Sequence, residues 1–90
     1  MKQNNFYLMV FQSKNHAIHL YSLLESKEMN IIKLISTPCA IMAGCSYSIK
    51  ILDESYIESI KQLAEDLNIK KYKFYYAERI KGKTDYRKLD

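Results

Sequence analysis

The chain has 90 residues, of which 48% are hydrophobic and 27% charged, a balance typical of a globular protein and not of a disordered or low-complexity chain. The apolar run that follows the first five residues is too short for a secretion signal or a membrane span. We therefore expect a cytoplasmic protein that forms one domain over residues 1–90, with its two cysteines as thiols.

The net charge of +4 is unevenly distributed along the chain. The basic residues of the last quarter are Lys70, Lys71, Lys73, Arg79, Lys81, Lys83, Arg87 and Lys88. Such clustering permits binding of an anion or of nucleic acid. We favour the simpler interpretation, a solvated basic surface.

The first half of the chain predicts a strand, a helix and a second strand. Residues 6–11 are apolar or aromatic on both alternating faces, which is typical of a central strand covered from two sides. Ser13 is a suitable N-cap for a helix that runs to about Lys27, since apolar residues follow at three- and four-residue spacing. Residues 30–36 are rich in β-branched side chains and predict a strand, which Pro38 ends.

The second half predicts the same kinds of element in the order strand, helix, strand. Residues 47–51 alternate apolar and polar side chains, as a strand with one buried face does. Residues 55–58 have the form of a capping box, and the helix that follows is expected to end at Asn68. The aromatic run 72–77 predicts the last strand, and residues 82–90 are expected to be a flexible polar tail.

This order, βαββαβ, predicts an α+β fold of the ferredoxin-like type: a two-layer sandwich with an antiparallel sheet of order 4-1-3-2 and two helices on one face. The alternating chain direction brings three junctions to one end of the sheet. They are residues 12–16, 37–46 and 68–71. The central connection should therefore face the start of the first helix and two lysines.

That central connection, Thr37–Cys45, contains the chain's one proline and both cysteines. It is longer than a tight hairpin needs, and long loops often have a function. The elements around it resemble the family of small bacterial selenium/sulfur carrier-like proteins. The resemblance spans about residues 7–67 and rests on Leu8–Phe11, Ser13, Ala17, Lys33–Pro38 and Ile41–Cys45. Two positions depart from the family pattern: Cys39 stands where Arg is usual, and Ser46 where Gly is usual.

The resemblance implies a carrier, not a true enzyme, that holds sulfur or selenium as a persulfide-type adduct on a loop thiol. Cys45 is at the family's cysteine position and is the candidate nucleophile, with Cys39 secondary. A buried, inert Cys45 is the alternative, because free cysteines are often buried. Six residues would support the thiol. Ser13 would cap the facing helix, Pro38 would shape the loop, and His16 is a weak candidate to take up a proton. Positive charge near the thiol would come from Lys14, Lys70 and Lys71.

The expected partner of such a carrier is a sulfur or selenium donor enzyme such as a cysteine desulfurase. We expect no cofactor and no metal, because two Cys and two His at these spacings make a poor zinc set. A rival hypothesis is an interaction module that forms a homodimer through the sheet face opposite the helices. RNA binding is the least favoured alternative, since the strand at 47–51 lacks the aromatic RNA-binding run. The sheet aromatics considered for it are Tyr7, Phe11, Tyr47, Tyr72, Tyr75 and Tyr76.

Overall fold

The computed structural model describes residues 5–27, 30–41 and 46–89. Its elements, in chain order, are β1 (Phe6–Phe11), α1 (Lys14–Ser26), β2 (Ile32–Ser36), β3 (Tyr47–Ile51), the short 3-10 helix η1 (Glu54–Tyr56), α2 (Ile57–Asp66), β4 (Tyr72–Ile80) and β5 (Lys83–Leu89). Within these ranges no helix is long and apolar enough to cross a membrane.

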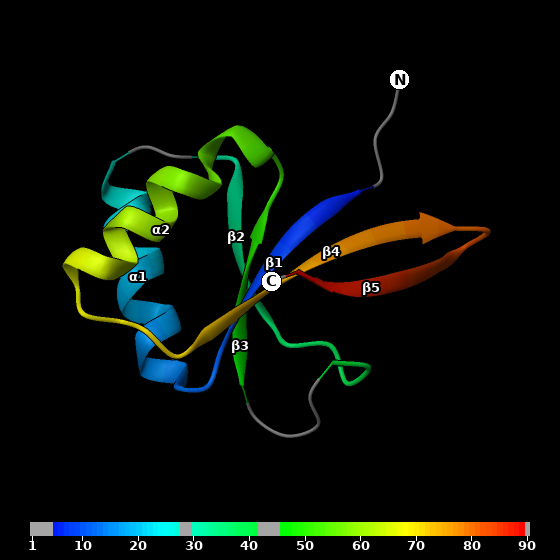
Figure 1. Cartoon of the computed structure of the whole chain (residues 1–90), viewed down its shortest axis with the longest axis horizontal. Helices are drawn as coiled ribbons and strands as arrows, with labels where there is room; N and C mark the ends of the chain where they lie inside the picture. Colours follow the sequence, from blue (N-terminus) through cyan, green and yellow to red (C-terminus); the bar gives the residue numbers. More distant parts are fainter. Residues whose placement is uncertain (1–4, 28–29, 42–45, 90) are drawn as a thin grey trace.

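The strands form one antiparallel sheet in the order β2-β3-β1-β4-β5. Both helices lie on the same side of it (Figure 1). The α+β class is therefore confirmed, and the first four strands stand in the order 4-1-3-2 when counted from β4. The layout as a whole is not the four-stranded sheet that we predicted, because β5 pairs with the outer edge of β4.

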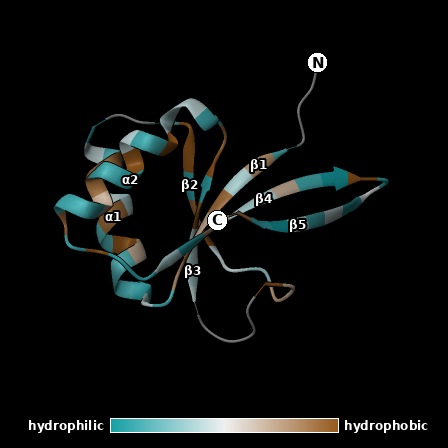
Figure 2. Cartoon of the chain, viewed as in Figure 1, coloured by the Kyte–Doolittle hydropathy of each residue, from teal (hydrophilic) through white to brown (hydrophobic). Residues whose placement is uncertain are grey.

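Strand β5 occupies residues for which we predicted a flexible polar tail. It pairs with β4 from Ile80↔Lys83 to Phe74↔Leu89, so Lys81 and Gly82 form a two-residue hairpin turn. Both turn residues have positive φ, 52° and 82°, as in the type I′ turns that match strand twist. The prediction failed because the strand is mostly polar, and its stability comes from pairing with β4 instead of from an apolar face (Figure 2).

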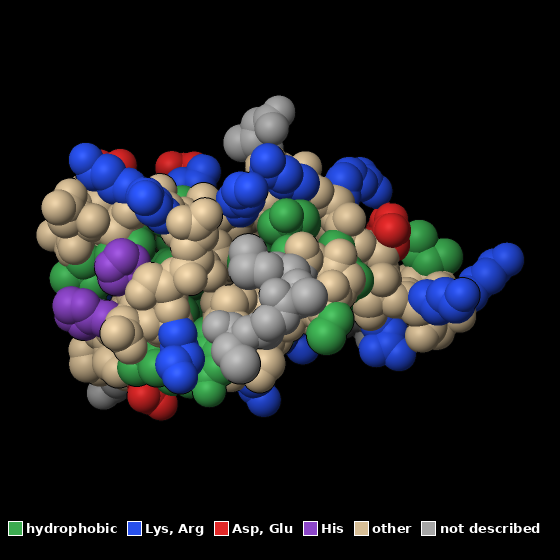
Figure 3. Space-filling view, turned by 90° about the horizontal axis from the view of Figure 1, so that it is seen from below, with side chains coloured by type: hydrophobic (Ala, Val, Ile, Leu, Met, Phe, Trp, Pro, Cys, Tyr) green, Lys and Arg blue, Asp and Glu red, His purple; other side chains and the backbone are tan. Residues whose placement is uncertain are grey.

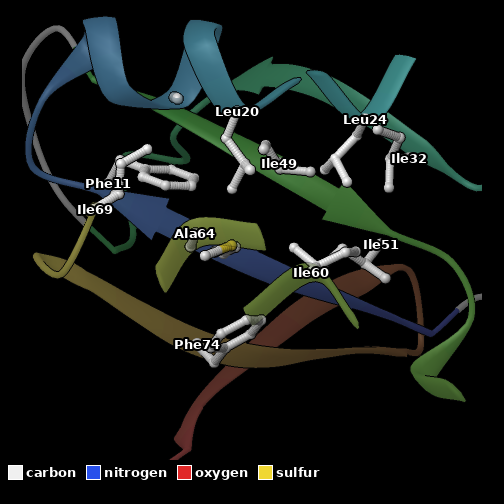
Figure 4. Packing of buried hydrophobic residues seen from close by; sticks show 12 residues of the cluster. Phe11, Leu20, Leu24, Ile32, Ile49, Ile51, Ile60, Ala64, Ile69 and Phe74 are labelled. Carbon is white, nitrogen blue, oxygen red and sulfur yellow. The ribbon is translucent and has the colours of Figure 1, made fainter. Parts of the chain in front are cut away.

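The hydrophobic core lies between the helices and the sheet face that they cover. Alternate residues of each strand point to this face, so β1 contributes Met9 and Phe11. Figure 4 shows Phe11 under the helices, with Leu20 and Leu24 of α1 directed at the sheet. The buried cluster comprises Met9, Phe11, Ala17, Leu20, Leu24, Ile32, Ile49, Ile51, Ile60, Ala64, Ile69 and Phe74.

Local hydrogen bonds explain where the helices begin and end. The Ser13 hydroxyl accepts a bond from the His16 backbone N–H, which confirms the predicted N-cap of α1. Helix α2 ends at Asp66, and Asn68, where we predicted its end, forms the turn that terminates it: Asn68 has φ 61°, and the Ile69 N–H donates to the Ala64 carbonyl oxygen in a Schellman arrangement.

The capping box predicted at residues 55–58 is not formed. The Asp53 carboxylate accepts bonds from both the backbone N–H and the hydroxyl of Ser55, so it starts η1 instead. These bonds hold the pKa of Asp53 below its usual value, the backbone bond contributing most. Helix α2 then continues directly from η1 without a side-chain cap.

We call the sheet side away from the helices the outer face. By strand alternation and register it carries Phe6, Leu8, Val10, Lys33, Ile35, Ser48, Lys50, Lys73, Tyr75, Ala77, Arg79, Thr84, Tyr86 and Lys88. In a homodimer through this face, β1 would contribute Phe6, Leu8 and Val10. Leu8 and Val10 are nevertheless buried within the chain itself.

The sheet aromatics that we considered for RNA binding do not lie where that function needs them. Tyr75 is on the outer face, whereas Tyr7, Phe11, Tyr47 and Tyr72 belong to or pack against the core under the helices. Tyr76 pairs with Tyr7 and therefore shares its face. The sequence places all six aromatics in or next to strands, but only the pairing register shows that they lie on two different faces of the sheet.

Candidate functional site

The three predicted junctions meet at one end of the sheet. The Gln12 backbone N–H donates to the Lys71 carbonyl oxygen over 3.4 Å, which joins the end of β1 to the start of β4. The Lys14 ammonium lies 5.8 Å from the ring centre of Tyr47, so the first residue of α1 reaches the first residue of β3. The end of the β2–β3 connection is thus beside the start of α1, and Ile41 of its described part lies beside Gln12 and Lys71.

The described part of this connection exposes one thiol. The Ile41 backbone N–H donates to the Pro38 carbonyl oxygen over 2.9 Å, and the resulting turn leaves Cys39 exposed as a free cysteine, while Pro38 is half-buried. From Ser36 the described part of the connection runs to the side of the sheet away from the helices (Figure 1), so it does not face the start of α1 as we predicted. Cys45, our principal candidate, lies outside the described residues.

A chain of three buried hydroxyls closes the base of the connection. The Ser46 hydroxyl donates to Thr37 Oγ1 over 2.7 Å, and Thr37 Oγ1 is also 2.7 Å from Ser48 Oγ. The Thr37 N–H donates to the Ser46 carbonyl oxygen over 2.9 Å, which extends the β2–β3 ladder by one pair. Because Thr37 Oγ1 accepts from Ser46, its own proton can go to Ser48, and all three buried groups are satisfied.

Sequence reasoning missed this cluster. We noted Ser46 as a departure from a family glycine, without a role. The signal was the alternation of Ser46 and Ser48 on one face of a strand whose other face is apolar, opposite Thr37 on the neighbouring strand. Buried hydroxyls at a loop base favour a fixed entry and exit for the connection.

A pocket of about 120 Å³ adjoins the connection. Its lining combines the end of β1, the loop and the start of β4: Val10, Gln12, Ile41, Lys71, Tyr72, Lys73 and Tyr75. Burial raises the pKa of the Tyr72 phenol, and the carboxylates of Glu65 and Glu58 raise it further. Tyr72 is therefore a neutral hydroxyl at physiological pH, and the charge of the lining comes from two lysines.

The other predicted site residues are on the surface near this end. Lys14, His16, Lys70 and Lys71 are exposed. In the view from below, the histidine side chains of α1 lie on the helix side of the molecule (Figure 3). The described residues contain no group of three or more His, Cys, Asp or Glu side chains that could hold a metal.

Comparison with known proteins adds a family assignment. No curated protein and no solved structure matches the chain. A family model does match residues 6–76, under the description "Putative Se/S carrier protein-like". The match runs from β1 into β4 and includes the whole β2–β3 connection. The chain therefore belongs to the Se/S carrier protein-like family.

Proposed function

We propose that the protein carries sulfur or selenium as an adduct on the thiol of Cys45. The observation that carries this proposal is the family match across residues 6–76, which includes both cysteines of the β2–β3 connection. The exposed turn at Cys39 supports it, because a carrier has to present its loop to other enzymes. The fixed base formed by Thr37 and Ser46 supports it too, since it anchors the residue next to Cys45 in the chain.

The chemistry requires one nucleophilic thiolate. The Cys45 thiolate attacks the terminal sulfur of a donor persulfide, a new S–S bond forms, and the donor's own S–S bond breaks. The electron pair of that bond leaves on the donor sulfur as a thiolate. The chain then holds a persulfide that it passes on by the reverse kind of step, so it acts as a carrier and not as a catalyst. A cysteine desulfurase supplies a persulfide of this kind, and the reducing cytoplasm keeps the receiving thiol free.

Intact-protein mass spectrometry after incubation with a cysteine desulfurase and cysteine tests the proposal. We expect one added sulfur atom on the wild type, lost on treatment with a thiol reductant. Cys39→Ser is the matched control, because it removes the other thiol six residues away in the same connection. This variant should keep the adduct, and Cys45→Ser should lose it. An adduct that forms on Cys39 alone, or on neither cysteine, would refute the assignment to Cys45.

The homodimer predicted from the sequence is a separate and weaker proposal. Its apolar basis is reduced, because Leu8 and Val10 are already covered within the chain and Phe6 is half-buried with the Lys50 ammonium 4.4 Å from its ring centre. A stable dimer buries at least about 1,000 Å² with good packing. Sedimentation velocity at several concentrations measures whether such an interface exists.

A further inference from the structure

The acidic side chains of the strands lie on one face of the sheet only, whereas basic side chains lie on both faces. The acidic strand residues Glu78 and Asp85 pair with each other across β4 and β5 on the side of Tyr76, the helix-covered face. The outer face carries five basic residues and, among the described residues, no acidic one. They are Lys33, Lys50, Lys73, Arg79 and Lys88. Figure 3, which views the whole molecule from below, shows more Lys and Arg than Asp and Glu side chains on that side.

These cations are not neutralised within the described part of the chain. The ion pairs found there are Lys61–Glu58 and Arg87–Glu78, and neither uses an outer-face residue. Lys33 and Lys50 are direct cross-strand partners, an arrangement of like charges that destabilises a sheet. The Lys33–Lys50 pair therefore costs stability. Residues that cost stability without a structural benefit are concentrated at functional sites.

The start of β4 offers hollows beside these charges. Lys73 lines the 120 Å³ pocket next to the β2–β3 connection. It also lines a second hollow of about 360 Å³, together with Lys61, Tyr72, Phe74, Lys88 and Leu89. Among the described residues, neither lining contains a carboxylate. A carboxylate side chain of a partner that enters on either side of Lys73 therefore meets lysines and neutral side chains of the described residues.

The side chains of the outer face favour one of three possible partners: nucleic acid, a second copy of this chain or an acidic protein. Single-stranded nucleic acid needs aromatic rings with free faces on which bases stack. Phe6, Tyr75 and Tyr86 are each only half-exposed. The Lys50 ammonium lies over the Phe6 ring, so that face of the ring is not free for a base. A second copy of this chain would place its own lysines against these lysines in a symmetric interface. A protein surface with carboxylates fits the charge and does not need stacking rings.

We propose that the outer face is a docking surface for an acidic protein partner, whose carboxylate side chains bind the lysines of β3, β4 and β5. The described part of the β2–β3 connection, which exposes Cys39, runs on this same side of the sheet (Figure 1), and its Ile41 lines a pocket with Lys73 and Tyr75. A partner docked there is therefore next to the connection. The docking itself needs no thiol, so it can be tested apart from the carrier chemistry.

Binding of a fluorescein-labelled polyglutamate peptide, followed by anisotropy at low salt, tests the proposal. The test variant is Lys73→Glu with Lys88→Glu. The matched control is Lys27→Glu with Lys83→Glu, which changes two exposed lysines at the end of α1 and on the helix-covered side of β5. Each double variant replaces two positive charges by two negative ones, so both bring the net charge from +4 to 0. Circular dichroism checks that each variant is folded.

We expect the test variant to lose about tenfold or more in affinity and the control to stay within about twofold. Cys45→Ser should bind as the wild type does, whatever the outcome of the persulfide experiment. An equal loss of affinity in both double variants would overturn the proposal, because binding would then depend on net charge and not on the outer face. No binding of the peptide by the wild type would overturn it as well. Tighter binding of a labelled single-stranded RNA of equal charge, with the same dependence on Lys73 and Lys88, would overturn it in favour of nucleic acid.

Discussion

The two faces of the sheet are made by the same strands and differ in what covers them. Met9 and Leu8 are neighbours in β1, and both have no exposed surface. Met9 lies in the cluster under the helices. Leu8 lies on the other side, with Lys50 and Tyr75 as its cross-strand partners. Burial alone does not distinguish a structural face from an interaction face; the charge of the surrounding residues does.

The largest test of this difference compares one residue type on the two faces. Ile49 is fully buried under the helices, and Ile35 of the adjacent strand is half-buried on the outer face. Ile49→Ala should lower the free energy of unfolding by about 2–5 kcal/mol, because it removes packed methyl groups and leaves a cavity. Ile35→Ala should cost roughly 1 kcal/mol, since less apolar surface is involved. Urea denaturation measures both, and equal losses would show that the outer face contributes to the core.

The hydroxyl chain at the base of the β2–β3 connection gives an intermediate effect. Thr37→Val keeps the shape of the side chain but removes the oxygen that Ser46 and Ser48 both contact. We expect a loss of about 1–3 kcal/mol, the cost of leaving buried polar groups without a partner. Ser36→Ala, at the exposed neighbouring position, is the control and should change stability by less than about 0.5 kcal/mol. A Thr37→Val protein as stable as the wild type would mean that water replaces the lost contact.

The strand pattern was enough to predict the central sheet and both helices. Apolar residues at all six positions of β1 indicated a strand covered from two sides, and the structure buries both Met9 and Leu8. Periodicity alone could not say which side the helices take. The position of Lys50 does indicate the side of the helices. It lies between Ile49 and Ile51 in β3 and points to the opposite face, so its face is the one without helices.

What the sequence did not predict depends on partners far along the chain. Strand β5 has no apolar run of its own, and its register with β4 decides its structure. Thr37 and Ser46 look like polar loop residues until the β2–β3 pairing brings them together. Chain direction correctly predicted that Gln12, Lys71 and the β2–β3 connection lie at one end of the sheet, but not that the described part of the connection turns away from the start of α1. The roles of the site residues stay predictions, and Cys45 is outside the described ranges.

The smallest effect concerns the turn that attaches β5, and with it Tyr86 and Lys88, to the outer face. Gly82 has φ 82°, and a Cβ added there would meet nothing within 4 Å, so Gly82→Ala introduces conformational strain without a clash. We expect a loss of about 1 kcal/mol. Lys81 has φ 52°, which asparagine tolerates better than lysine, so Lys81→Asn should stabilise the turn by roughly 0.5 kcal/mol.

Because β5 is an edge strand, these two changes should act on it before they act on the core. Amide hydrogen exchange resolves the effect strand by strand. Exchange in β5 should become faster in Gly82→Ala and slower in Lys81→Asn, while the amides of β1 keep the wild-type rate. If both variants shifted β1 and β5 together, the hairpin would unfold only with the whole sheet, and the outer face would be as structural as the face under the helices.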